Sequence, residues 1–541
     1  MANLGFIIDN RRCIGCHACT VACKSEHDVA VGVNRTWVKY IEKGEFPHSK
    51  RLFSVMRCNH CDNAPCVDIC PVTALYRRPD GIVDFDNRRC IGCKACMQAC
   101  PYDALYIDPK THTAAKCNYC AHRIDKGLEP ACVNVCPTQA IVSGDLDDPE
   151  SKISKLRNRQ PVTARKTEKG TLPSLFYIDA DADSLDPVAT EVAESSMWGS
   201  QSSGVGHYAQ HSRHALDRLG DLLSLGERSE MLSPESPGSG SASGRAADIV
   251  QAATPQPRRA YDAPQKGVLW GWQVSGYLWT KSIAAGVVMV PLLAHLLKSV
   301  NVSPAVELIG MAIAILFMGL TGGLLVWDLD RPTRFLYVLL RPQWKSWLVR
   351  GAYIITAYMG VLSAYTVMLL AGGHFVFEPL VQVVLLVLAA LTATYTAFLF
   401  AQAKGRDFWQ SPMLPVHMLN HALIAGASAL ALFSQMGGES WSGFLQVVLY
   451  VTLLINLLST GFELLVSHPT EDSSRVAESI LRGRYRVIFW GGVIGLGTLV
   501  PLAVLMWAPS VGLPVAGLLA IVGVFLAQHI SVRAPQQVPL S

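Results

Sequence analysis

Sixteen cysteines, all within the first 136 residues of a 541-residue chain, constrain this sequence more than any other feature. They form four quartets, of which the first and third read C-x2-C-x2-C-x3-C, the second C-x2-C-x4-C-x3-C and the fourth C-x2-C-x11-C-x3-C. In order, the quartets are Cys13, Cys16, Cys19 and Cys23; Cys58, Cys61, Cys66 and Cys70; Cys90, Cys93, Cys96 and Cys100; and Cys117, Cys120, Cys132 and Cys136. In such runs three close thiolates bind one iron–sulfur cluster and the fourth binds another. The pattern therefore predicts four [4Fe–4S] clusters.

Two other uses of cysteine fit this pattern less well. Zinc sites also use C-x2-C, but usually as two separated pairs, whereas three of these quartets end in Cys-Pro, at Cys70, Cys100 and Cys136. A disulfide framework suits a small secreted domain, whereas this chain is long and starts without the apolar run of a signal peptide. Iron–sulfur ligation is the interpretation that remains.

An internal repeat organises the cysteine-rich part. Residues 9–19 and 86–96 differ at one position of eleven, which indicates a duplicated two-cluster ferredoxin. We expect short strands at 5–9, 82–86 and 104–107, and a further strand at 175–178. Gly15 and Gly92 would let the backbone approach a cluster closely. The predicted first domain, residues 1–190, is thus an α+β duplicated ferredoxin-like domain.

The composition changes after this domain. Residues 191–260 are rich in Ser, Gly and Pro, which is typical of a flexible linker. Residues 261–535 form the second predicted domain, and they contain eight apolar runs near the roughly 20 residues needed to cross a bilayer. These runs are 275–297, 304–327, 347–371, 378–402, 412–434, 442–466, 486–507 and 511–530. The prediction is an all-α bundle of eight transmembrane helices, with Gly319–Gly323 and Gly491–Gly497 allowing close helix contacts. The net charge of +4 gives no reason to expect nucleic acid as a partner.

Ionisable residues gather at one end of the predicted spans. Lysine and arginine concentrate in the loops on the side of the cysteine-rich domain, so the positive-inside rule predicts that domain on the cytoplasmic side of the inner membrane. Ionisable groups within a membrane are costly and usually functional. A quinone is apolar and takes up two electrons with two protons, so we expect quinone contact or proton exchange at this end. The candidate residues are Tyr277, Lys281, Asp328, Arg331, His417, His421 and Glu463.

Structural roles for these residues remain open at this stage. Either histidine could make an interhelical hydrogen bond, Asp328 and Arg331 could form a helix-end pair, and Tyr277 could be an interface anchor. Haem b is not expected, because His417 and His421 share one helix face and could not both be axial ligands of one haem.

The quartets resemble the electron-transfer subunit of DMSO-reductase-family molybdopterin oxidoreductases, through Cys-Ile-Gly-Cys at 90–93 and Cys-Pro-x-x-Ala at 70–74. The resemblance covers about residues 1–180 and implies a pairing of quartet one with four and of quartet two with three. The implied ligand sets are Cys13, Cys16, Cys19 and Cys136; Cys23, Cys117, Cys120 and Cys132; Cys58, Cys61, Cys66 and Cys100; and Cys70, Cys90, Cys93 and Cys96. It also implies a separate large catalytic subunit that contains molybdopterin.

Residues 261–530 look like the NrfD-like membrane subunit of polysulfide reductase. The resemblance is carried by Trp270-Gly-Trp272, Tyr277, Ala284-Ala-Gly286 and Asp328-Leu-Asp-Arg-Pro332 with Arg334-Phe335. It implies a membrane anchor that handles menaquinone or ubiquinone without haem. Here the two subunits are fused, and the Ser/Gly-rich linker is the seam.

Together these features predict an electron-transfer and membrane-anchor subunit of a respiratory oxidoreductase. It would carry electrons between a catalytic partner and quinone, and the partner would handle the substrate. The alternatives are the same role in a nickel–iron hydrogenase, an energy-converting proton-translocating module that uses His295 and Glu307, and a plain tether without a quinone site.

Overall fold

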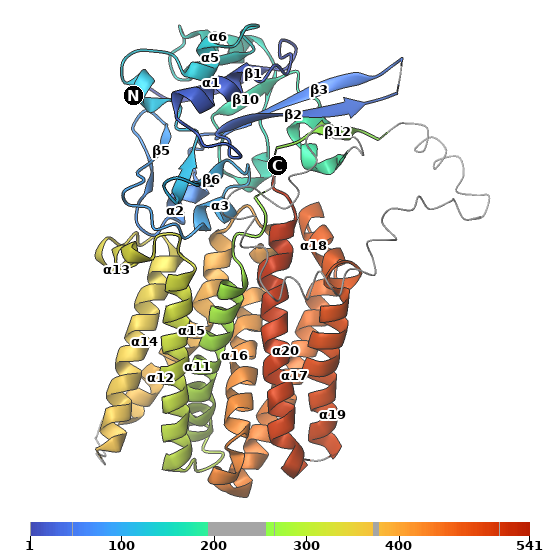
Figure 1. The fold of residues 1–541 in the computed structure, drawn as a ribbon. Coiled ribbons are helices and arrows are strands. Elements are labelled where there is room, and N and C mark those ends of the chain that lie inside the picture. Colours follow the sequence, from blue (N-terminus) through green and yellow to red (C-terminus); the bar gives the residue numbers. More distant parts are fainter. Residues whose placement is uncertain (1, 46, 193–255, 264–265, 372–377, 508) are drawn as a thin grey trace, which may run out of the picture. The chain divides into compact units, whose positions relative to one another are not determined.

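The structure is a computed structural model that describes residues 2–45, 47–192, 256–263, 266–371, 378–507 and 509–541. It divides into two compact units, which are treated separately (Figure 1). The cysteine-rich unit comprises Met1–Leu269 with Pro539–Ser541, and the helical unit comprises Trp270–Val538. Most of the predicted linker, 193–255, lies outside the described residues. The change from one unit to the other comes at Trp270, later in the chain than the expected residue 261.

The cysteine-rich unit is built on four small sheets. Their strand orders are β8-β1-β10-β9, β11-β12-β2-β3, β4-β5 and β6-β7. The strands are β1 (Leu4–Asp9), β2 (Thr36–Lys43), β3 (Lys50–Arg57), β4 (Leu75–Arg77), β5 (Val83–Phe85), β6 (Leu105–Asp108), β7 (Thr113–Lys116), β8 (Ile141–Asp145), β9 (Val162–Thr163), β10 (Leu175–Ile178), β11 (Glu191–Val192) and β12 (Arg258–Tyr261). The strands expected at 5–9, 82–86, 104–107 and 175–178 correspond to β1, β5, β6 and β10. The predicted α+β, ferredoxin-like class is confirmed.

Short helices connect these strands and carry the cysteine motifs. They are α1 (Ala18–Glu26), α2 (Pro65–Asp68), α3 (Ala95–Ala99), α4 (Ala121–Ile124), α5 (Ala131–Asn134), α6 (Lys152–Arg159) and α7 (Ala182–Leu185). The 3₁₀ turns η1 (Thr167–Lys169) and η2 (Pro187–Ala189) complete the connections. The repeat is visible in the backbone, because His17 and Lys94, which cap α1 and α3, have φ of 58° and 62°. The same local sequence therefore builds the same loop-to-helix turn in both halves.

Strand β12 explains why the cysteine-rich unit extends past residue 261. It pairs antiparallel with β2 and parallel with β11. Asp262, directly after β12, lies 2.7 Å from the Nζ of the buried Lys39 and 2.7 Å from Arg259. A buried lysine requires such a counter-charge, so this ion pair fixes the segment that follows the predicted linker to the sheet of β2 and β3.

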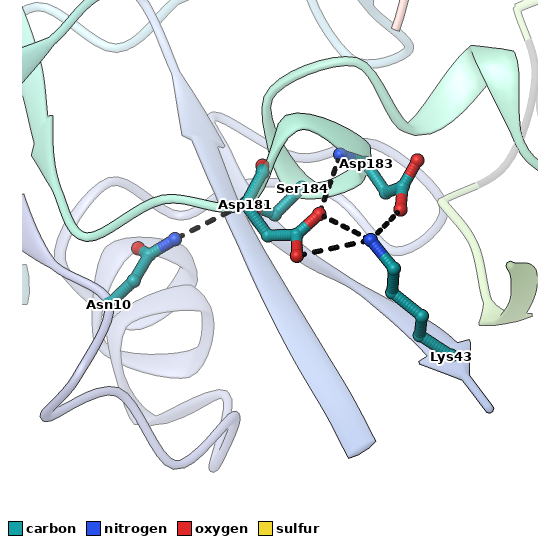
Figure 2. A network of polar contacts seen from close by, with 5 residues as sticks. All are labelled: Asn10, Lys43, Asp181, Asp183 and Ser184. Carbon is teal, nitrogen blue, oxygen red and sulfur yellow. Dashed lines mark hydrogen bonds and ion pairs between the residues drawn. The ribbon is translucent and has the colours of Figure 1, made fainter. Parts of the chain in front are cut away.

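A second polar network joins α7 to the β2–β3 hairpin (Figure 2). Lys43 Nζ lies 3.3 Å from Asp181 and 2.8 Å from Asp183, and the Asp181 carboxylate accepts a hydrogen bond from the Asp183 amide. Asn10, in the loop that leads to the first quartet, donates to Ser184 Oγ at 3.4 Å. The network therefore tethers a cysteine-bearing loop to the sheet behind it.

Among the described residues of the second unit, eight helical segments are long and apolar enough to cross a membrane, which confirms the predicted class. They are Trp272–Leu296 (α11), Pro304–Trp327 (α12), Trp347–Leu370 (α14), Glu378–Gln402 (α15), Leu414–Ala431 (α16), Ser434–Leu465 (η6 and α17), Ile488–Trp507 (the π-helical η7 and α19) and Gly512–Gln537 (within α20). Shorter elements are η4 (Pro332–Arg334), α13 (Tyr337–Leu340), η5 (Asp407–Gln410) and α18 (Glu471–Leu481). The apolar segment of α11 is 89% buried, so α11 is a central helix. The apolar segment of α14 is 17% buried, so α14 lies on the outside of the bundle. The chain is a multi-pass membrane protein.

Close helix packing occurs at glycines, but only partly at those expected. A Cβ added at Gly286 of α11 would lie 1.9 Å from the carbonyl oxygen of Ala422 in α16, and Gly426 faces Gly286 in return. Gly497 and Gly523 make a similar contact. The expectation for Gly319–Gly323 is wrong, because a Cβ at each of these glycines would have nothing within 4 Å.

Candidate functional site

The cysteine-rich unit brings sulfurs from different quartets close to one another. All sixteen cysteines lie in the described part of the chain, and none of them forms a disulfide bond. Burial raises the pKa of Cys13, Cys19, Cys23, Cys66 and Cys96, and neighbouring thiols add to the rise. The neighbours are Cys136 and Cys16 for Cys13; Cys132 and Cys13 for Cys19; Cys117, Cys132 and Cys120 for Cys23; Cys100, Cys58 and Cys61 for Cys66; and Cys93, Cys90, Cys70 and Cys66 for Cys96. We name four groups after the ligand sets that the resemblance implies. Group 1 is Cys13, Cys16, Cys19 and Cys136; group 2 is Cys23, Cys117, Cys120 and Cys132; group 3 is Cys58, Cys61, Cys66 and Cys100; and group 4 is Cys70, Cys90, Cys93 and Cys96.

The four groups follow one another in a row. Cys19 of group 1 interacts with Cys132 of group 2, and Cys117 of group 2 interacts with Cys58 of group 3. Cys96 of group 4 interacts with Cys66 of group 3. Thiols of successive groups therefore interact with one another, as stepwise electron transfer between neighbouring clusters would need.

The surroundings of the sulfurs fit metal-bound thiolates. Burial raises the pKa of Cys19 to about 11 and that of Cys117 to about 12, so these thiols would stay protonated without a cation. Metal binding requires the thiolate. Around group 4, Cys70, Cys90, Cys93 and Cys96 all line one cavity of about 20 Å³. Four thiols around a common space, three of them buried and that of Cys93 partly exposed, form the donor set of a [4Fe–4S] cluster. No three His, Cys, Asp or Glu side chains among the described residues converge as ligands of a single ion.

Backbone donors also point at the sulfurs. The Ala74 amide donates to Cys70 Sγ at 3.2 Å, and the Gly92 amide donates to Cys90 Sγ at 3.4 Å. Gly15 has φ +69° and a Cβ there would lie 2.3 Å from the Phe53 ring, so only glycine fits this loop. Such N–H donors stabilise the reduced, more negative cluster and influence its potential.

Group 2 has side-chain donors that the sequence analysis missed. Arg57 Nη1 lies 3.0 Å from Cys132 Sγ, His27 Nε2 lies 3.2 Å from Cys120 Sγ, and His60 Nε2 lies 3.8 Å from Cys117 Sγ. A signal did exist, because quartets two and four share the pattern basic-Cys-Asn-aromatic-Cys, as Arg57-Cys-Asn-His-Cys and Lys116-Cys-Asn-Tyr-Cys.

In the membrane unit, the seven candidate residues do not form one cluster. Lys281 is fully buried, with Nζ 4.3 Å from the centre of the Tyr395 ring and 6.0 Å from that of Tyr277. It also donates to Thr396 Oγ1. Asp328, at the end of α12, is close enough to interact electrostatically with Tyr277. We call Tyr277, Lys281, Tyr395 and Thr396 the lysine cage; Arg331 lies in the turn that leads to η4.

The other three candidates meet between α16 and α17. His417 Nε2 lies 3.0 Å from Glu463 Oε2, in an orientation that makes an ion-pair contact and not an aligned hydrogen bond. His421 Nε2 lies 3.1 Å from Asn456 Oδ1, and Ser459 Oγ lies 3.4 Å from His417 Nδ1. The sequence analysis missed the two α17 partners, Asn456 and Ser459, although both are polar residues inside an apolar span.

His417, His421 and Glu463 line a cavity of about 70 Å³, the His417 pocket. It is lined mainly by apolar side chains, with His417, His421, Glu463 and Gln528 as its principal polar groups. The apolar wall includes Leu278, Phe400, Phe408, Trp409, Leu414, Met418, Leu464, Ile480, Phe489, Val493, Ala527 and Ile530. An apolar cavity with a few convergent polar groups is the usual form of a small-molecule site. The pocket lies where α16 begins and α17 ends, which is also the end of the bundle where α11 begins and α20 ends.

A separate polar contact joins the C-terminal end of α11 to the N-terminal end of α12, at the ends of these helices that lie away from the His417 pocket. His295 Nε2 contacts Glu307 Oε1, and the Glu307 side chain is 12% exposed. This contact brings together the two residues on which the energy-converting alternative depends.

Three family models match the chain. The model described as polysulphide reductase, NrfD, matches residues 262–539, and two 4Fe-4S dicluster models match residues 50–146 and 12–76. The matches agree with the resemblances drawn from the cysteine quartets and from the membrane motifs.

Curated relatives match the iron–sulfur part. A tetrathionate reductase subunit of Salmonella typhimurium is 44% identical over 197 residues, which is 36% of this chain and 78% of that protein. A polysulfide reductase polypeptide of Wolinella succinogenes is 44% identical over 179 residues, or 32% of this chain and 93% of that protein. Thiosulfate reductase electron transfer subunit PhsB of Salmonella typhi is 44% identical over 171 residues, or 31% of this chain and 88% of that protein.

Proposed function

Because the chain belongs to the polysulphide reductase NrfD family and carries 4Fe-4S dicluster domains ahead of its membrane anchor, we propose that it links a catalytic partner to a membrane quinone through four [4Fe–4S] clusters. The observation that carries this proposal is the covalent fusion of a row of four cysteine groups to a membrane unit with a polar-ended apolar pocket. The fusion keeps both electron-handling parts in one molecule.

Each cysteine group would hold one cluster. In groups 1 and 2 the ligands come from quartets one and four, and in groups 3 and 4 from quartets two and three. The clusters would supply one-electron transfer. The protein supplies burial, four thiolates per cluster and N–H donors such as those of Ala74 and Gly92. These groups determine where an electron is stable along the row.

The His417 pocket would hold the quinone head group. Its apolar wall suits a lipid-soluble ring, whether menaquinone or ubiquinone, and its polar groups could exchange the protons that accompany the electrons. Glu463 and His417 lie 3.0 Å apart, so a proton can pass from one to the other once the two side chains align as a hydrogen bond. His421, held by Asn456, lies on the same helix face and offers a second donor or acceptor to the ring.

The lysine cage is proposed as a second locus of quinone contact or proton exchange, together with Asp328 and Arg331, which follow α12. Its support is a buried amine surrounded by two tyrosines and a threonine, because such a group is costly unless it is used. Lys281→Met removes the amine and keeps a similar side-chain length. Unchanged quinone-linked turnover in that variant would remove the cage from the proposal.

The partner would be a large catalytic subunit, since the matched relatives are named as parts of tetrathionate, polysulfide and thiosulfate reductases. We propose a molybdopterin-containing partner on the cytoplasmic side of the inner membrane. A nickel–iron hydrogenase is the alternative, and metal analysis of the co-purified complex separates molybdenum from nickel.

A second candidate function is favoured by the contact between His295 and Glu307. A partly buried histidine–carboxylate pair at the opposite helix ends could admit protons for an energy-converting step. Proton release by liposomes that contain the complex would support it if Glu307→Gln abolishes the release while electron transfer continues.

The experiment that tests the main proposal is quinone-linked turnover of the complex after Cys58→Ala. Group 3 loses a ligand in this variant, so the row is interrupted and turnover should be lost. Turnover at the wild-type rate would refute transfer through the four groups.

A further inference from the structure

Arg57 is a buried cation among the cysteine sulfurs. It is the last residue of β3, its side chain is fully buried within a residue that is 1% exposed, and its Nη1 lies 3.0 Å from Cys132 Sγ. The guanidinium carbon lies 4.9 Å from the centre of the Phe6 ring, which supports it from below. Strand β3 is paired along its length with β2, so Arg57 sits on a rigid element.

The guanidinium has N–H donors without an acceptor and a positive charge without a carboxylate partner in the described part of the chain. Its Nε and Nη2 are buried without a hydrogen-bond partner, and no carboxylate forms an ion pair with it in the described part of the chain. The groups that interact most with its charge are the thiols of Cys132, Cys19 and Cys117. A guanidinium stays protonated in proteins, and a buried charge without a counter-charge is strongly unfavourable. An anion built from these thiolates is therefore what this site requires.

The position of Arg57 selects particular groups. Cys132 and Cys117 belong to group 2, and Cys19 belongs to group 1, so the cation lies where these two groups adjoin. In the other half of the repeat, Lys116 occupies the matching position, but it donates to the carbonyl oxygens of Val83 and Cys117. Of these two matching basic residues, only Arg57 contacts a sulfur, so the contact does not follow from the repeat alone.

We propose that Arg57 is a positioning residue that raises the reduction potential of the group 2 cluster and, to a smaller extent, that of group 1. The inference rests on the proposed function, because it requires clusters at these groups. One-electron reduction adds one negative charge to a cluster and its thiolates, and no bond forms or breaks. The electron comes from a neighbouring cluster in the row, and a fixed positive charge with free N–H donors stabilises the reduced form. The cation would thus favour the state in which the electron is held on the group 2 cluster.

The test is a redox titration of the purified full chain with dithionite, followed by electron paramagnetic resonance. Cys120→Ser identifies the signal of group 2. Arg57→Gln should lower the equilibrium constant for reduction of that cluster at least tenfold, about 59 mV for one electron, because a charge-assisted hydrogen bond is lost. The group 4 signal should keep its potential, since Arg57 does not contact that group.

Two variants make the outcome decisive. Arg88→Gln removes a charge whose side chain is 93% exposed, two residues before Cys90, and should shift no potential. Arg57→Lys keeps the charge but loses the fork of donors, so its shift should be smaller than that of Arg57→Gln. If Arg57→Gln leaves the group 2 potential unshifted, the inference is overturned. If the glutamine variant loses iron, the same measurement on Arg57→Lys decides, and an unshifted potential there overturns the inference. An equal shift of all four signals also overturns it, because that indicates general loosening. A wild-type protein without clusters would instead refute the proposed function on which the inference rests.

Discussion

Replacing Glu463 with glutamine tests the His417 pocket most sharply. The carboxylate lies 3.0 Å from His417 Nε2, and the two side chains are 16% and 8% exposed, so water screens the pair weakly. When His417 carries a proton, the two unit charges at this separation attract by about 5.5 kcal/mol with an effective dielectric constant near 20. Glutamine has nearly the same shape but cannot carry the proton. A positioned proton carrier contributes about 10²–10⁴-fold to a rate, so we expect a loss of at least about 100-fold, or roughly 2.7 kcal/mol of transition-state stabilisation.

The assay is quinone-linked turnover of the membrane complex, with dithionite reduction of the clusters measured on the same samples. Turnover should fall while cluster reduction stays normal, because Glu463 lies in the other unit from the cysteines. Glu471→Gln is the matched control, since this carboxylate is 73% exposed on α18 and should leave turnover unchanged. A Glu463→Gln complex that turns over within about twofold of wild type would refute a role for the pair in proton exchange.

Three further predictions concern assembly and packing. Cys58→Ala should lower bound iron by about four atoms of about sixteen per chain, measured by metal analysis; unchanged iron would show that Cys58 is not a ligand. Gly286→Ala should destabilise the membrane unit by about 1–3 kcal/mol, measured by thermal denaturation, because the new methyl group would overpack against Ala422. Gly319→Ala is the control, since open space surrounds the added Cβ, and it should change stability by less than about 0.5 kcal/mol. Equal effects of the two substitutions would contradict the packing. Oxidative removal of iron should make residues 2–192 sensitive to protease and leave the helical circular dichroism of the membrane unit intact, because that unit contains no cysteine. Loss of the helical signal together with the gain in protease sensitivity would contradict independent units.

Much of the fold could be predicted because the physical constraints are local. Few local structures fit the cysteine spacing, the duplicated turn at Gly15 and Gly92, and the eight apolar runs. The strands and the membrane-crossing helices therefore lie close to the predicted positions. The position of β12 could not be predicted, because its pairing with β2 joins residues far apart in sequence across the linker.

The candidate site was predictable in kind but not in arrangement. Sequence reasoning grouped Lys281 with His417, but they occupy different places, because helix packing and not spacing along the chain decides which faces meet. The partners Tyr395 and Asn456 were missed for the same reason. Arg57 was missed although the same pattern around Lys116 marked it, because the pattern does not say which of the two basic residues contacts a sulfur. Only the fold shows that Arg57 points at Cys132 while Lys116 donates to backbone carbonyl oxygens.

The central claim, that electrons pass from the cysteine-held clusters to a quinone in the membrane unit, is tested most directly by reoxidation. The full chain is reconstituted in vesicles with or without long-tailed menaquinone, reduced with dithionite, freed of the excess, and followed by electron paramagnetic resonance. The account predicts that the reduced-cluster signals disappear in vesicles that contain quinone and persist in vesicles that lack it or that hold the Glu463→Gln variant. Clusters that stay reduced beside the quinone would contradict it.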